Sequence, residues 1–130
     1  MGGTGMVKTA ISIFVSFLLL VGISYYETTY IQTTFLTFEK HLTALYKKTE
    51  AETASYEDGK AVRDFWMEKK KTLHIWIPHT SIETVDYQLN EAMGYLYEQK
   101  HVDAMPKIEV LIEISKRIPR LFSIRLENIF

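Results

Sequence analysis

The sequence predicts an all-α protein in which an N-terminal transmembrane helix precedes a small antiparallel helical bundle of about four helices. Two observations lead to this expectation. The first is a single uncharged apolar stretch near the N-terminus. The second is the helical spacing of apolar residues through the rest of the chain, without the alternation that is typical of sheets. A length of 130 residues is enough for one domain and leaves no room for a second substantial core.

The apolar stretch runs from Thr9 to Tyr26, 18 residues that lie between Lys8 and Glu27. As a helix it would span about 27 Å, close to a bilayer core of roughly 30 Å. It ends in two tyrosines, whose rings prefer the boundary between hydrocarbon and water. We therefore expect a short cytoplasmic N-terminus at 1–8, a transmembrane anchor at 9–26 and an extracytoplasmic helical domain at 27–130.

The orientation of the anchor follows from the positive charges. Lys8 and the amino terminus precede it, and no Lys or Arg follows it until Lys40, so the N-terminus is expected inside and the domain outside the cell membrane. A cleaved signal peptide is the alternative, although its apolar region is usually about 7 to 15 residues and ends in a small-residue site. Here Gly22-Ile23-Ser24 offers small residues only at its ends. A buried helix of a soluble protein is the third reading.

Apolar spacing then predicts four helices in order. The first runs on from the anchor, because no Pro or Gly interrupts Ser24 to Asp58, and the Asp58-Gly59 pair marks the turn that follows it. The apolar seam along one face of this helix, from Ile31 to Leu45, fits packing within the chain or against a second copy in a homodimer. The residues expected on the inner faces of the first two helices are Ile31, Phe35, Phe38, Leu42 and Leu45, then Val62, Phe65, Trp66 and Leu73.

The third helix is expected to begin near Thr80, since Thr80 and Glu83 have the spacing of a capping box. The fourth should begin with Asp103 as its N-cap, which places Pro106 in the first turn. Pro119 predicts a kink or break before a short final helix. The expected inner residues are Ile82, Val85, Leu89, Met93 and Leu96, then Ile108, Leu111, Ser115 and Ile118.

Composition excludes several classes of function. From Glu27 onward there are 14 basic residues against 16 acidic ones, a net charge of −2, which argues against nucleic-acid binding. The absence of cysteine excludes disulfides and thiolate chemistry. No arrangement of a nucleophile and a base is readable, so we expect no enzyme activity, no catalytic residue and no cofactor. The run Lys69 to Lys71 is typical of a solvated helix face, although it also suits anionic headgroups.

Few residues are candidates for a ligand site. His79 and Glu83 stand one helical turn apart and are weak metal candidates, because zinc needs a third ligand. No metal is therefore expected. A small-molecule pocket would need aromatic walls with a few polar groups. The residues that fit this description are Trp66, His79, Tyr87 and Tyr95.

The whole chain resembles a bacterial family, domain of unknown function 4363, found chiefly in Gram-positive bacteria. The resemblance lies in Trp-Ile-Pro-His-Thr-Ser-Ile-Glu at 76–83 and in the closing segment from Ile118 to Phe130. His79, Glu83 and Leu126 to Ile129 occupy positions typical of that family, whereas Pro78 and the GGTG start depart from it. The resemblance implies an uncharacterised membrane-anchored helical protein, without known catalytic residues, whose gene often lies near those of multi-pass membrane proteins.

Two functions from different classes remain. The first is an interaction or accessory subunit, held by the lipid bilayer beside an integral membrane protein on which the C-terminal tail docks; the same tail would equally fold back onto the bundle. The second is an extracytoplasmic domain that senses a small molecule or a metal. The tail residues expected to bind the partner are Leu126, Glu127, Asn128, Ile129 and Phe130.

Overall fold

The computed structural model describes the backbone of residues 2–129 and the side chains of residues 3–121. This part of the chain is all-helical and contains no strand, which confirms the predicted fold class. The helices are α1 (Gly2–Glu50), α2 (Tyr56–Leu73), α3 (His79–Tyr97) and α4 (His101–Ile129).

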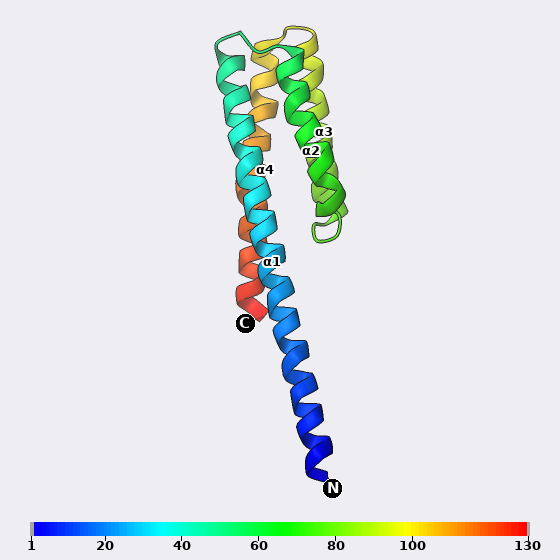
Figure 1. Cartoon of the computed structure of the whole chain (residues 1–130). Helices are drawn as coiled ribbons and strands as arrows, with labels where there is room; N and C mark the ends of the chain where they lie inside the picture. Colours follow the sequence, from blue (N-terminus) through cyan, green and yellow to red (C-terminus); the bar gives the residue numbers. More distant parts are fainter. Residues whose placement is uncertain (1, 130) are drawn as a thin grey trace.

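The four helices form an antiparallel bundle in which each packs on its neighbours in the chain and α4 closes the ring against α1. The connections are short, at 51–55, 74–78 and 98–100. Short links force consecutive helices to run antiparallel. Figure 1 shows that α1 and α4 extend well beyond the α2–α3 pair, and that the N-terminal half of α1 projects alone from one end of the bundle. We call this end the base and the opposite end the distal end.

The helix α1 joins the apolar stretch to the bundle without interruption from Gly2 to Glu50. It is the one helix, within the described residues, that is long and apolar enough to cross a membrane. Its apolar side chains between Met6 and Tyr26 are exposed, and burial starts at Ile31. The apolar stretch is therefore not a buried core helix in this structure, since the described residues leave the apolar side chains from Met6 to Tyr25 exposed.

The core lies where the sequence places it. The seam from Ile31 to Leu45 faces into the bundle, so it packs on the other helices of the same chain. Of the expected inner residues, Phe65 is half-buried and the others are buried. Ser115 lies among them because its hydroxyl donates to the carbonyl of Leu111 at 2.8 Å, which satisfies the buried group.

The prediction of a turn at Asp58-Gly59 is wrong. The helix α2 begins earlier, at Tyr56, with Ser55 as its N-cap, so that both residues lie in its first turn. Gly59 is present for packing: a Cβ at this position would lie 2.6 Å from Sδ of Met93 and 2.9 Å from Cδ1 of Leu96. The glycine lets α2 and α3 approach each other closely near the distal end.

The predicted caps of α3 and α4 are also wrong. The helix α3 begins at His79 after Pro78, with no side-chain cap, so Thr80 lies inside it. In α4 the carbonyl of Lys100 accepts the first helical bond, from Ala104, and Asp103 falls in the first turn. Each helix therefore begins earlier than the predicted capping residue, directly after a short connection. Pro106 consequently lies in the second turn of α4, not the first.

The break predicted at Pro119 does not occur, because α4 is one continuous helix from His101 to Ile129. A proline inside a helix costs the hydrogen bond to the carbonyl four residues earlier, here that of Ser115. Packing offsets this cost, since Ile118 is buried and α4 lies along α1 on both sides of the proline.

Two helices end in the same motif with an unusual residue. After α1 the amides of Glu52 and Thr53 donate to the carbonyls of Thr49 and Lys48, and after α3 the corresponding bonds form around Gln99. This pattern is a Schellman motif, which needs a left-handed residue that is usually glycine. Glu52 and Gln99 both have φ of 58° and carry the steric cost of a Cβ in that conformation.

Replacing Gln99 with glycine should therefore stabilise the bundle by about 1 kcal/mol. The measurement is urea unfolding of the intact protein in mild detergent, followed by circular dichroism. The control is Glu98→Gly at the preceding position, where φ is −83° and glycine relieves no steric cost. An equal change in both variants would contradict a strained left-handed residue.

Candidate functional site

The helices α2 and α3 enclose a groove of about 440 Å³. Trp66 forms its floor, and its indole Nε1 donates to Oδ1 of Asp86 at 2.7 Å. Lys70 pairs with the other oxygen of Asp86 at 3.1 Å. These partners satisfy both oxygens of the carboxylate, so the contact holds α2 against α3. The residues that line the groove are Arg63, Asp64, Trp66, Met67, Lys70, Asp86, Leu89 and Asn90.

The structure does not gather the four aromatic and histidine candidates around this groove. Trp66 is in the core and lines it, but Tyr87 points to solvent from α3 and Tyr95 packs at the edge of the core. His79 is exposed at the start of α3. A ligand in the groove would therefore meet Trp66 together with charged side chains, rather than an aromatic wall.

The weak metal candidates do lie together. Nε2 of His79 is 2.9 Å from Oε1 of Glu83, and the ring of His74 stacks on that of His79 with centroids 5.6 Å apart. Within the described residues, no three His, Cys, Asp or Glu side chains are arranged to hold a metal ion. The pair at 79 and 83 is an exposed side-chain contact across one helical turn.

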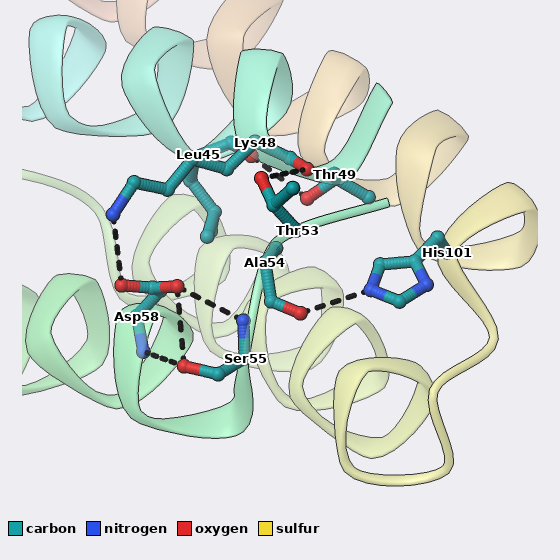
Figure 2. Close-up of polar contacts among 8 residues, drawn as sticks. All are labelled: Leu45, Lys48, Thr49, Thr53, Ala54, Ser55, Asp58 and His101. Atoms are coloured by element: carbon teal, nitrogen blue, oxygen red, sulfur yellow. Dashed lines mark hydrogen bonds and ion pairs between the residues drawn. The ribbon is translucent and has the colours of Figure 1, made fainter. Parts of the chain in front are cut away.

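A second polar cluster lies at the distal end, where the end of α1 meets the starts of α2 and α4 (Figure 2). Ser55 and Asp58 form a capping box: the amide of Ser55 donates to Oδ2 of Asp58 at 2.9 Å, and the amide of Asp58 donates to Oγ of Ser55 at 3.2 Å. Nζ of Lys48 lies 3.1 Å from the same carboxylate. His101 donates from Nε2 to the carbonyl of Ala54 at 2.9 Å, which ties α4 to the α1–α2 connection.

The contacts of Asp58 lower the pKa of its carboxyl below the ordinary 3.8, chiefly through the backbone amide of Ser55 and then through Lys48. A lowered pKa in the folded state adds stability above the unfolded pKa, and this stability is lost as the pH falls through the folded pKa.

We therefore expect Asp58→Asn to destabilise the bundle at pH 7 and to destabilise it less at an acid pH below 3.8, where the charge of Asp58 contributes less to stability. Urea unfolding at both pH values checks this. Asp64→Asn is the matched control, because the ion pair of Asp64 with Lys60 is exposed and local to one helix face. A loss for Asp58→Asn that is the same at both pH values would show that charge has no part in the cap.

At the base, aromatic rings from α1 and the α2–α3 connection meet. The ring of Trp76 lies 6.3 Å from that of Tyr26 and 5.5 Å from that of Tyr30, measured between centroids. Tyr26 also stacks on Tyr30 at 6.2 Å. Because Tyr26 ends the apolar stretch, these contacts place the connection at 74–78 level with the end of that stretch.

The C-terminal tail belongs to the last turns of α4. Arg120 and Gln32 line the same shallow hollow between α4 and α1. Since the two helices are antiparallel, the residues from Leu121 to Ile129 carry the backbone of α4 about 13 Å further, past the level of Tyr26 and alongside the end of the apolar stretch. Figure 1 shows the end of α4 beside α1, beyond the α2–α3 connection. The side chains of the predicted tail site at 126–129, and the whole of Phe130, lie outside the described residues.

Comparison with known families decides the relationship of this chain. The model of a family described as "Domain of unknown function (DUF4363)" matches residues 25–129. The chain belongs to the DUF4363 family. The family predicted from the sequence is thus confirmed over residues 25–129. No curated protein and no solved structure matches the chain.

The match to DUF4363 begins at Tyr25, the last turn of the apolar stretch, and covers the bundle and the tail. The part of the chain that defines the family is therefore the bundle together with the helix end that enters it. The contacts at the base and the distal end all lie within this part.

Sequence reasoning missed several residues that build contacts between the helices of the DUF4363 domain, namely Ser55, Asp58 and Asp86. Ser55 and Asp58 carry a readable signal, since their spacing is that of a capping box. Asp86 carries none, because its partner Trp66 is 20 residues away. The contact between Tyr26 and Trp76 is likewise non-local, and no spacing rule predicts it.

Proposed function

We propose that this protein is an accessory subunit, anchored in the membrane by α1, whose bundle lies outside the cytoplasm and docks on an integral membrane protein. The observation that carries the proposal is the continuity of α1 from Gly2 to Glu50. Because this helix has no break, the position of the anchor in the membrane also fixes the position of the bundle beside it. The proposed docking is therefore confined to partners in the same membrane.

The orientation rests on the charges that flank the apolar stretch. Lys8 and the amino terminus precede it, and the next cation, Lys40, lies inside the bundle half of α1. This asymmetry favours retention of the N-terminus in the cytoplasm. The apolar stretch is proposed to stay attached as an anchor, because its last residues, Tyr25 and Tyr26, belong to the same helix as the core residue Ile31.

The tail is the proposed docking segment. The backbone of α4 returns to the level of the anchor, so the segment from Leu126 to Ile129 would lie where a neighbouring membrane protein emerges from the bilayer. A non-enzymatic role fits the described residues, whose polar contacts serve as caps and links between helices.

The alternative function, sensing of a small molecule or metal, has one supporting feature, the groove between α2 and α3. Two of its polar side chains, Lys70 and Asp86, are already paired with each other. A ligand that used these two side chains would have to displace their ion pair, so we place docking ahead of sensing.

The test of docking uses a photo-crosslinking amino acid at Asn128, with the same amino acid at Val102 as the matched control. Val102 is exposed in the first turn of α4, and this helix begins at the distal end, away from the base. After illumination in native membranes we expect an adduct between position 128 and one multi-pass membrane protein, and none from position 102. A chain truncated after Arg125 should lose the partner on co-purification. Adducts that contain only this chain would overturn docking and point to self-association.

A further inference from the structure

The α2–α3 connection is a tight, ordered link rather than a loose loop. The amides of Ile75, Trp76 and Ile77 donate to the carbonyls of Thr72 or Leu73 at 2.9 to 3.1 Å. The side chain of Ile77 is buried in the core and fixes the link from inside the bundle. The side chains that point outward from it are consequently held in place.

These outward side chains are apolar or amphipathic. Ile75 is 71% exposed at the tip of the link, although isoleucine is among the residues most often buried. Trp76 is half-buried against Tyr30, and Tyr26, in ring contact with Trp76, is exposed. An exposed isoleucine fixed next to three amphipathic rings is a composition typical of a surface that meets the boundary of a bilayer.

The position of this surface identifies what covers it. Tyr26, in ring contact with Trp76, is the last residue of the apolar stretch, so the link lies at the depth where the stretch leaves the hydrocarbon. Figure 1 shows the link at the end of the bundle from which the N-terminal half of α1 projects. Any membrane that α1 crosses therefore comes up to the link.

We propose that the α2–α3 connection is a second membrane contact, in which Ile75 and Trp76 insert into the headgroup layer of the leaflet that α1 leaves. The occupant of this surface is phospholipid. The inference rests on the proposed anchoring by α1 and goes beyond it: the bundle is held at two points and stands in one fixed orientation on the bilayer. The last turns of α4, which extend beyond the link beside α1, then lie at the membrane as well.

The absence of native cysteine makes a direct test simple. Ile75→Cys and Val102→Cys each receive an environment-sensitive fluorophore in the intact chain, reconstituted into phosphatidylcholine vesicles. The two positions are matched in exposure, 71% and 73%, and lie at opposite ends of the bundle. Lipids brominated near the headgroup should quench the label at 75 at least threefold more than the label at 102, and its emission should shift to the blue.

Native tryptophan provides an independent readout. In Trp66→Phe the remaining Trp76 should be quenched by the same lipids, whereas in Trp76→Phe the remaining core Trp66 should not. Circular dichroism establishes that each variant keeps its helices. If Trp66→Phe does not fold, the cysteine pair alone decides.

Flotation of the vesicles separates this inference from the anchoring on which it rests. Protein that floats with the vesicles and shows equal quenching at 75 and 102 overturns the second contact and leaves the anchor in place. Protein that does not float overturns both. Protein that floats and shows selective quenching at 75 and at Trp76 supports both.

Discussion

Replacing Trp66 with alanine is expected to destabilise the bundle by about 3 to 5 kcal/mol, the usual cost of removing a large buried aromatic side chain. Trp66 is 1% exposed, and its ring lies 5.2 Å from that of Phe38 and 6.1 Å from that of Phe35. The substitution leaves a cavity between α1 and α2 and removes the indole that binds Asp86. Urea unfolding of the intact protein in mild detergent, followed by circular dichroism, measures the loss.

Two further variants separate packing from hydrogen bonding at this position. Trp66→Phe keeps an aromatic ring and loses the donor to Asp86, which retains Lys70, so a loss of about 1 to 2 kcal/mol is expected. Tyr87→Ala, on the exposed face of α3, should change the stability by less than about 0.5 kcal/mol. A similar small change for Trp66→Ala would contradict the placement of Trp66 in the core.

The second large effect is expected at Gly59. A valine at this position should destabilise the bundle by about 1 to 3 kcal/mol, because its Cβ would overlap Sδ of Met93 and Cδ1 of Leu96. Gly94→Val is the matched control, since Gly94 is also helical but has no atom within 4 Å of an added Cβ. This control should be neutral or slightly stabilising, because glycine is a poor helix former.

The double variant Gly59→Val with Met93→Ala tests the mechanism. If the clash with Met93 causes the loss, the two substitutions should be non-additive, and the double variant should be more stable than the sum of the single effects implies. Strict additivity would mean that Gly59 is needed for some reason other than the close approach of α2 and α3.

The fold was predictable from sequence because its main determinant is the spacing of apolar residues. Ile31 to Leu45 recur at intervals of three and four and are buried along one face of α1. The positions of the ends were not predictable in the same way. Ser55 with Asp58 and Thr80 with Glu83 have the same capping spacing, yet the structure uses the first pair and not the second. The choice depends on tertiary position, which the local sequence does not contain.

The turn predicted at Gly59 and the break predicted at Pro119 were wrong for a related reason. Gly59 indicates a turn when read locally, but it is required by the side chains of α3 that pack on it. Pro119 indicates a break, but the packing of α4 on α1 continues past it. In both cases a contact between helices outweighs a local preference of about 1 to 3 kcal/mol.

The candidate sites were harder to predict because their contacts are non-local. The pairing of Trp66 with Asp86, and of Tyr26 with Trp76, joins residues 20 and 50 positions apart. His79 and Glu83 were identified because a helix brings together residues one turn apart, and their side chains are in contact. The tail at 126–130 was identified by resemblance, and docking through it stays a prediction.

The proposed topology, a membrane-anchored bundle with its N-terminus inside, can be tested by the accessibility of single cysteines on either side of the apolar stretch. Gly3→Cys and Val102→Cys are both at exposed positions, and the natural chain has no cysteine. A membrane-impermeant maleimide should label position 102 in intact cells and position 3 only after permeabilisation, in a protein of full-length mass. Labelling of position 3 but not of position 102 in intact cells, or a mature protein without residues 1–26, would contradict this topology.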